Sequence, residues 1–200
     1  MRQPGQNGKD RRVQRTQQLL QGGLRTLLGQ KPMEEIAVLD ITEAANVNRA
    51  TFYDHYADKL DLFNALIAAE FQELLERRNI CFDGSCGSGL AAIVLAVGDY
   101  LEQIHGDKPA CTRHAASGPL IDAAITLAIR RILLNGLENK AISIAVPREV
   151  FASMLSGTIY GAVKEWLSSR QWKMEEEALL LLVPLIQPLL VHSHPGSGPS

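Results

Sequence analysis

Residues 41–59 constrain the fold of this chain more than any other segment, because they contain two short apolar stripes separated by a turn residue. Ile41, Ala44 and Ala45 supply the apolar side of a first helix, and the two alanines are small enough for a second helix to cross closely. Asn46 follows, and asparagine tolerates the left-handed backbone conformation that such a turn requires. The segment therefore predicts two short helices joined by a tight turn.

The second helix of this pair has a predicted start and two distinct faces. Asn48 is typical of an N-cap, because its side-chain oxygen can accept the free backbone amide of Thr51 or of its neighbour. Phe52 and Tyr56 are four residues apart and are expected to point inward. The outward face then carries a set of polar and charged side chains: Arg49, Thr51, Tyr53 and His55.

An outward face of this composition is suited to DNA. Arginine can form a bidentate contact with guanine, and threonine can touch the methyl group of thymine. Asp58 is expected to cap a third helix, which places Lys59 at its first position, beside whatever the second helix touches. Tyr53 and Lys59 are suited to phosphate oxygens. Unrelated helical hairpins show a similar pattern, in which the polar groups simply face the solvent.

The segment around residues 36–62 resembles the DNA-binding motif of the TetR/AcrR family of transcriptional regulators. The matching residues are Ile41, Ala44, Ala45, Val47, Arg49, Thr51, Phe52, Tyr53, His55, Tyr56, Lys59 and Leu62. The resemblance implies an all-α homodimer, with an N-terminal three-helix DNA-binding head and a larger C-terminal helical body that forms a four-helix dimer interface. It also implies that the second motif helix enters the major groove.

The resemblance implies a set of DNA contacts, with Tyr53 and Lys59 on phosphates. The expected DNA-binding residues are Asn48, Arg49, Ala50, Thr51, Tyr53, His55 and Lys59. The sequence departs from the family pattern at Asn46, at Ala50 and at Ala37, where a threonine often caps the first motif helix. The absence of that cap costs about 1 kcal/mol if nothing replaces it.

Charge and composition agree with this interpretation. The chain has 200 residues, 46% of them hydrophobic, and no obvious strand alternation. Its net charge of -2 is unusual for a protein held to DNA by bulk charge, but residues 1–31 hold seven Lys or Arg and one acidic residue. The basic end is therefore predicted to be the DNA end. The basic residues Arg2, Lys9, Arg11, Arg12 and Arg15 could form an arm that follows the DNA backbone or enters a minor groove, or they could simply form a solvated basic start.

The sequence predicts four segments. Residues 1–9 and 193–200 are rich in Gly, Pro, Ser and Asn and are expected to be disordered. Residues 10–57 are predicted to form the DNA-binding domain, and residues 58–192 a ligand-binding and dimerisation domain. The longest apolar run, residues 178–191, is too short for a membrane span and contains two prolines, so a cytoplasmic protein is expected.

Helices are expected through most of the chain, at residues 10–28, 58–79, 90–105, 119–136, 147–168 and 174–191. Gly22 and Gly23 interrupt the first of these. Either that helix is weak there, or another backbone packs closely against it. Pro119 is expected at the first position of its helix, where the missing N–H costs nothing.

The body is expected to bind a small apolar ligand and a second copy of the chain. The candidate ligand-binding residues are Phe71, Leu74, Tyr100, Ile104, His105, Cys111, His114, Ile125 and Tyr160. The candidate dimer-interface residues are Phe151, Leu155, Ile159, Val163, Leu179 and Val183. These apolar stripes would otherwise fill the core of a single chain. The expected partners are thus double-stranded DNA with an inverted-repeat operator, a second protomer and a small-molecule effector, with no membrane.

Two alternatives concern the cysteines and histidines of the body. Cys81, Cys86, Cys111, His105 and His114 could bind a metal or sense redox state, although their spacings match no paired zinc signature. Cys111 could also act as a nucleophile with His114 as its base, but the sequence indicates no third group to orient them. We therefore expect no enzymatic activity, no cofactor and no metal site.

Overall fold

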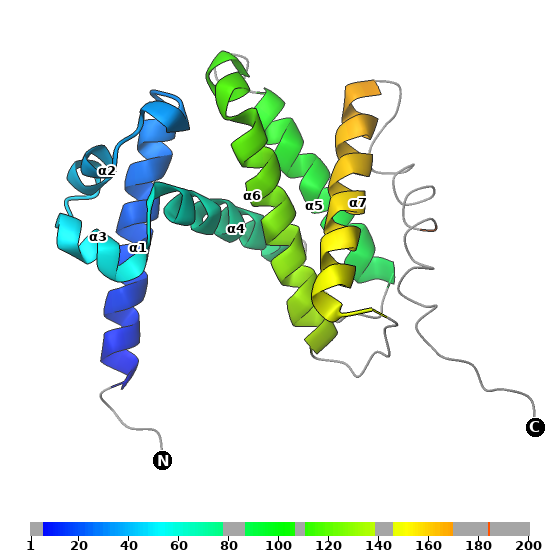
Figure 1. The fold of residues 1–200 in the computed structure, drawn as a ribbon, viewed down its shortest axis with the longest axis horizontal. Coiled ribbons are helices and arrows are strands. Elements are labelled where there is room, and N and C mark those ends of the chain that lie inside the picture. Colours follow the sequence, from blue (N-terminus) through cyan, green and yellow to red (C-terminus); the bar gives the residue numbers. More distant parts are fainter. Residues whose placement is uncertain (1–5, 78–86, 107–110, 139–145, 170–183, 185–200) are drawn as a thin grey trace, which may run out of the picture. The chain divides into compact units, whose positions relative to one another are not determined.

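The computed structural model describes residues 6–77, 87–106, 111–138, 146–169 and 184, and all the secondary structure in these ranges is helical (Figure 1). Side chains are described within these ranges except those of residues 6–10, 87–88, 104–106 and 111–117. The elements are α1 (Gln6–Leu28), the 3-10 helix η1 (Met33–Glu35), α2 (Val38–Ala44), α3 (Arg49–His55), α4 (Lys59–Arg77), α5 (Gly87–Gly106), α6 (Cys111–Glu138) and α7 (Arg148–Ser169). The all-α fold class is therefore confirmed.

The chain divides into two compact units. The first contains the residues up to 67 together with residues 108–121, and the second contains residues 68–107 and those from 122 onward. In the first unit, α1 packs against both α2 and α3. The largest fully buried side chains of this unit are Leu20, Leu24, Met33, Ile36, Ile41, Phe52, Leu62 and Leu66.

A close approach of two backbones holds α1 against α2. A Cβ atom added to Gly23 would lie 3.1 Å from the backbone nitrogen of Ala45 and 3.2 Å from the carbonyl oxygen of Ile41. A Cβ atom at Gly22 would meet no atom within 4 Å. Helix α1 continues through both glycines. The expectation that another backbone packs closely against the helix is therefore confirmed at Gly23.

In the second unit, α4 and α5 meet through an aromatic and a polar contact. The hydroxyl of Tyr100 donates to Oε2 of Glu70 at 2.7 Å, and the rings of Phe71 and Tyr100 pack edge to face with centroids 6.4 Å apart. Small and large apolar residues of α5, including Ile93 and Val97, are fully buried. These contacts place the C-terminal half of α4 in the core of the unit.

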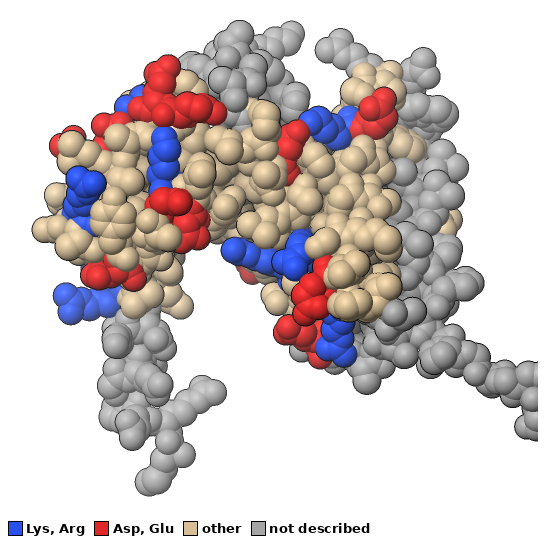
Figure 2. All heavy atoms as spheres, in the orientation of Figure 1, with Lys and Arg blue, Asp and Glu red and all other residues tan. Residues whose placement is uncertain are grey.

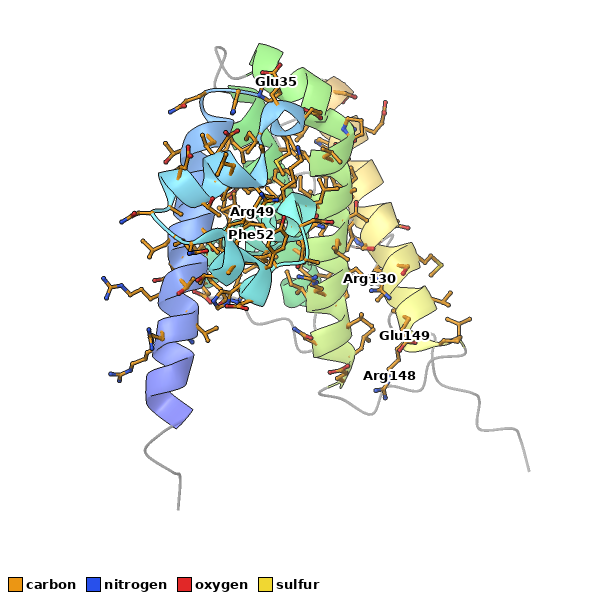
Figure 3. All side chains as sticks on the ribbon, turned by 60° about the vertical axis from the view of Figure 1, so that its left-hand side comes forward. Glu35, Arg49, Phe52, Arg130, Arg148 and Glu149 are labelled. Carbon is orange, nitrogen blue, oxygen red and sulfur yellow. The ribbon has the colours of Figure 1, made fainter. Side chains whose placement is uncertain are left out.

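Polar contacts join α6 to α7. Asp122 on α6 accepts from the hydroxyl of Tyr160 at 2.5 Å and from the ammonium of Lys164, both on α7. Burial, and then the hydrogen bond to Asp122 and its charge, raise the pKa of Tyr160 well above the usual tyrosine range. Further along, Nε of Arg130 donates to the hydroxyl oxygen of Ser153 at 2.8 Å; Figure 3 labels Arg130 on α6 and Glu149 near the start of α7. The two helices are thus held together at two points.

Several helix boundaries differ from those predicted. Helix α1 begins at Gln6 rather than at residue 10, and α5 begins at Gly87 rather than at residue 90. The prediction that Pro119 starts its helix was wrong, because α6 begins at Cys111 and Pro119 lies inside it. A proline removes one hydrogen bond from a helix, and the remaining bonds can carry the helix past it. The expected last helix, residues 174–191, lies outside the described residues.

No helix in the described ranges is long and apolar enough to cross a membrane.

Candidate nucleic-acid interface

The turn between α2 and α3 adopts the predicted conformation. Asn46 has a φ of 51°, in the left-handed region, and is the non-glycine residue with positive φ among those described. The amide of Asn46 donates to the carbonyl of Glu43 at 3.1 Å, and the amide of Val47 donates to the carbonyl of Thr42 at 2.9 Å. These bonds end α2 and fix the path of the chain into α3.

Two side chains cap the helices that follow the turn, as predicted. Oδ1 of Asn48 accepts from the amide of Ala50 at 2.8 Å, and α3 begins at Arg49. Oδ1 of Asp58 accepts from the amides of Leu60 and Asp61, each at 2.8 Å, at the start of α4. Each cap satisfies amides that have no partner within their own helix. Both helix starts are therefore fixed by local hydrogen bonds.

The start of α2 has a different arrangement, because Ala37 has no side-chain acceptor. Oδ2 of Asp40 instead accepts from the amide of Ala37 at 2.9 Å and from Nζ of Lys31 at 2.5 Å. The hydrogen bond from Lys31, followed by the one from Ala37, lowers the pKa of Asp40. The amide of Ala37 is thus satisfied by the carboxylate, as in one half of a capping box, whereas Ala37 provides no side-chain cap for the first-turn amides that a threonine hydroxyl would accept.

Helix α3 has one buried and one exposed face. Phe52 is fully buried and Tyr56 is 5% exposed, as predicted from their spacing. Nε2 of Gln21, on α1, donates to the hydroxyl oxygen of Tyr56 at 3.4 Å, and burial is the main cause of the raised pKa of Tyr56. The buried face thus anchors α3 to α1.

The exposed face of α3 carries Arg49, Ala50, Tyr53 and Asp54, whereas Thr51 and His55 are half-buried. A guanidinium nitrogen of Arg49 donates to the hydroxyl of Tyr53 at 3.4 Å, and the guanidinium carbon lies 5.7 Å from the centroid of the tyrosine ring. Figure 3 labels Arg49 beside Phe52 on this helix. The guanidinium of Arg49 therefore lies against an aromatic ring on the exposed face of α3.

Lys59 has an unexpected environment. Its ammonium donates to the backbone carbonyls of Met33, Glu34 and Ile36 at 3.0, 3.1 and 2.7 Å. An ammonium has three N–H donors, and these three carbonyls account for all of them. A phosphate contact by Lys59 would therefore compete with bonds that hold η1 to the start of α4.

The charge of this region is divided between two segments. Residues 1–31 are strongly basic, but residues 32–60, which contain the motif itself, hold two basic and six acidic side chains. On the face shown in Figure 2, the described Lys and Arg of α1–α3 are interspersed with Asp and Glu. The motif therefore has an excess of acidic side chains, and the exposed arginines of α1 supply positive charge: Arg11, Arg12, Arg15 and Arg25.

Comparison with known proteins agrees with this geometry. The sequence model of the family described as "Bacterial regulatory proteins, tetR family" matches residues 23–66. The amino-terminal domain of this chain belongs to the tetR family. The matched residues run from the second half of α1 into α4, so they include both helices of the motif and both of its caps.

A curated relative and two solved structures are similar to this chain. The uncharacterized HTH-type transcriptional regulator YxbF of Bacillus subtilis (strain 168) is 39% identical over 82 residues, which span 38% of this chain and 22% of the relative. A TetR transcriptional regulator from Streptococcus agalactiae 2603V is 23% identical, with 91% of this chain and 99% of that chain covered and a TM-score of 0.49. The transcriptional regulator FadR from Bacillus subtilis, solved in complex with stearoyl-CoA, is 17% identical, with 88% and 98% covered and a TM-score of 0.38.

Two residues of the tetR-family domain were missed by the sequence interpretation. Asp54 is exposed on α3, and Leu39 is exposed on α2 although it is a large apolar residue. Leu39, Thr42 and Glu43 of α2 line an open hollow of about 430 Å³ together with residues 46–49. The apolar spacing of α2 gave no sign that its leucine would face solvent, because period alone does not distinguish a buried leucine from an exposed one.

The predicted ligand-binding residues are only partly described. Phe71, Leu74, Tyr100, Ile125 and Tyr160 are all buried in the second unit, with at most 8% of each exposed. The side chains of Ile104, His105, Cys111 and His114 lie outside the described part of the chain, as do Cys81 and Cys86. The metal-binding and redox-sensing alternatives therefore remain predictions.

The predicted dimer-interface residues of α7 lie in the core of the single chain. Phe151, Leu155, Ile159 and Val163 are buried within the single chain, with at most 5% exposed, so this stripe fills the core of the second unit. The spacing of apolar residues along a helix predicts that they are buried, but it does not indicate whether the same chain or a second protomer covers them. Leu179 and Val183 lie outside the described residues.

Proposed function

We propose that this chain is a homodimeric transcriptional repressor, which binds an inverted-repeat operator and releases it when a small apolar ligand binds the helical body. The observation that carries the proposal is the capped turn of residues 42–50, which presents Arg49 at the exposed start of α3. That arrangement lies within a domain of the tetR family, whose members are regulatory proteins.

Arg49 is proposed to read a base, because the start of α3 is where a recognition helix contacts base edges in the major groove. The ring of Tyr53 supports its guanidinium at 5.7 Å. A supported guanidinium loses less conformational freedom when it forms two parallel hydrogen bonds to guanine. Asn48, Ala50, Thr51 and His55 would complete the contact surface.

The dimer is proposed to form through the exposed side of α7. Val150 and Met154 are 55% and 49% exposed there. A Cβ atom added to Gly157 or Gly161 would meet no described atom within 4 Å, so a neighbouring helix could approach closely. Sedimentation equilibrium of the purified chain would test this, since Met154→Glu should raise the dimer dissociation constant if the face is an interface.

The ligand is proposed to act through the body, where the buried Phe71, Tyr100 and Tyr160 would contribute to an apolar site. A ligand that favours one dimer geometry over another changes DNA affinity by its differential binding, and about 1–3 kcal/mol is a typical coupling. Loss of operator binding on addition of small apolar compounds, with no loss of helical signal, would support this part of the proposal.

Selection of binding sites from random duplex DNA at near-physiological salt tests the DNA-binding function. We expect an inverted repeat whose half-site centres are separated by about 34 Å or a multiple of it. Arg49→Ala should relax the preference at one base position per half-site and weaken operator binding by about 1–3 kcal/mol.

Arg15→Ala is the matched control for this selection, because Arg15 is an exposed arginine on α1 outside the motif. It should weaken binding to all sequences without changing the selected motif. Enrichment of no motif by the wild-type protein would overturn the proposed function. An unchanged motif for Arg49→Ala would instead show that another face reads the DNA.

A further inference from the structure

Leu39 is a large apolar residue that lies exposed on α2. It is 54% exposed, although Ile41 on the same helix is fully buried. The high exposure is not a fraying effect, because the amide before α2 is held by Asp40 at 2.9 Å and the helix continues for two turns. A rigid helix therefore holds a large apolar side chain in water.

The position of Leu39 relates it to the reading surface. It lines the same open hollow as Asn48 and Arg49, the cap and first residue of α3. The hollow thus brings together a leucine of α2 and the arginine at the start of α3. Because the turn at Asn46 fixes both helices, the backbone positions of Leu39 and Arg49 keep a constant relation to one another.

The chemistry of the major groove offers one partner for each group. Guanine presents two acceptors that match a guanidinium, and the methyl group of thymine is the apolar group on the base edges. Phosphate oxygens offer no apolar surface, and a contact with a sugar would carry no direct sequence information. We propose that Leu39 is a specificity-determining residue, which contacts the methyl group of a thymine near the base that Arg49 reads. The inference rests on the proposed DNA-binding function.

The experiment begins with the half-site found by selection with the wild-type protein. Each thymine of the half-site is replaced in turn by deoxyuridine, which keeps the base pair and removes only the 5-methyl group, and the dissociation constant is measured. One position should show a weaker complex, by about fourfold per half-site, as expected for one buried methyl group. The Leu39→Ala variant should bind the thymine and uracil duplexes with equal affinity at that position.

Leu19→Ala is the matched control, because Leu19 is 46% exposed on α1 and does not line the hollow. It should retain the full preference for thymine over uracil. A melting temperature equal to that of the wild type would show that Leu39→Ala leaves the fold intact.

The outcomes separate this inference from the function on which it rests. If a motif is selected but contains no thymine whose methyl group matters, or if the methyl preference survives in Leu39→Ala, the role of Leu39 is overturned and the regulator function stands. If Leu39→Ala weakens all duplexes equally, Leu39 contacts the backbone and the inference is again overturned. If no motif is selected, both fail together.

Discussion

The ammonium of Lys59 joins two segments that are far apart in the sequence. It donates to three carbonyls of residues 33–36, and these bonds connect η1 to the first turn of α4. Hydrogen bonds to a charged donor contribute more than neutral ones, and carbonyls that lose a donor in a half-buried site are costly. At the scale of the residue, Lys59 therefore positions the chain around the motif.

Replacing Lys59 by alanine should lower the free energy of unfolding by about 1.5–3 kcal/mol, because three carbonyls lose their donor. The dependence of operator affinity on salt concentration should be nearly unchanged. A lysine that contacts phosphate would instead lower that slope by about 1 when removed. Urea denaturation and a salt titration of DNA binding would measure the two quantities on the same variant.

Arg49→Ala is the control for Lys59→Ala, since Arg49 is exposed and its removal should change base preference while leaving the unfolding free energy within about 0.5 kcal/mol. A Lys59→Ala variant of wild-type stability with a lower salt slope would contradict the positioning role. It would support the phosphate contact implied by the family resemblance.

At the scale of the element, the position of α2 depends on how closely α1 lets it approach. Gly22→Ala should raise the unfolding free energy by about 0.4–1 kcal/mol, because the new methyl group meets no neighbour and the unfolded chain loses freedom. Gly23→Ala should lower it by about 1–3 kcal/mol, because the methyl group would meet backbone atoms of Ala45 and Ile41 that cannot rotate away.

Thermal unfolding of the two variants measures this difference at adjacent positions of one helix. Operator binding provides a second measurement, since a shift of α2 by a few tenths of an ångström would move the turn and the start of α3. We expect weaker operator binding for Gly23→Ala and none of this loss for Gly22→Ala. Equal stabilisation by both substitutions would mean that α1 and α2 separate without cost.

The sequence predicts the elements whose signals are local. Asn46, Asn48 and Asp58 each act on amides or dihedral angles within three residues, so the turn and both caps follow from the residue type and its neighbours. The environment of Lys59 could not be predicted in this way, because its acceptors lie 23 to 26 residues earlier and any residue type supplies a carbonyl.

Packing partners were also beyond the reach of the sequence. The stripe that includes Leu155 and Ile159 was predicted to form a dimer interface and is buried within the single chain, because the periodicity is the same for a core and for a dimer interface. The start of α6 was missed because Pro119 was given its preferred position, whereas the helix tolerates the proline in its interior. Leu39 was missed because the spacing of apolar residues does not distinguish a buried leucine from an exposed one.

At the scale of the whole molecule, we expect nonspecific electrostatic attraction to DNA and sequence-specific base contacts to come from different segments. Residues 1–31 hold seven basic side chains. Residues 32–60, which contain the motif, hold six acidic and two basic side chains. The total charge of the chain is only -2. Since nonspecific affinity grows with the number of phosphates neutralised, α1 should determine most of it, and the motif should contribute little.

Replacing Arg11, Arg12 and Arg15 by glutamine should weaken binding to the operator and to random duplex by the same factor, and should leave the selected motif unchanged. The slope of log affinity against log salt should become shallower by at most about 5 for the dimer, near 0.9 for each phosphate that the protein no longer neutralises. Glutamine at Arg77, Arg131 and Arg148, all exposed in the second unit, makes the same change in net charge and serves as the control. If that control reduced the slope as much, the attraction would depend on the total charge of the chain, and α1 would have no special role. If the α1 substitutions instead altered the motif, these arginines would contact bases, and reading would not be confined to α2 and α3.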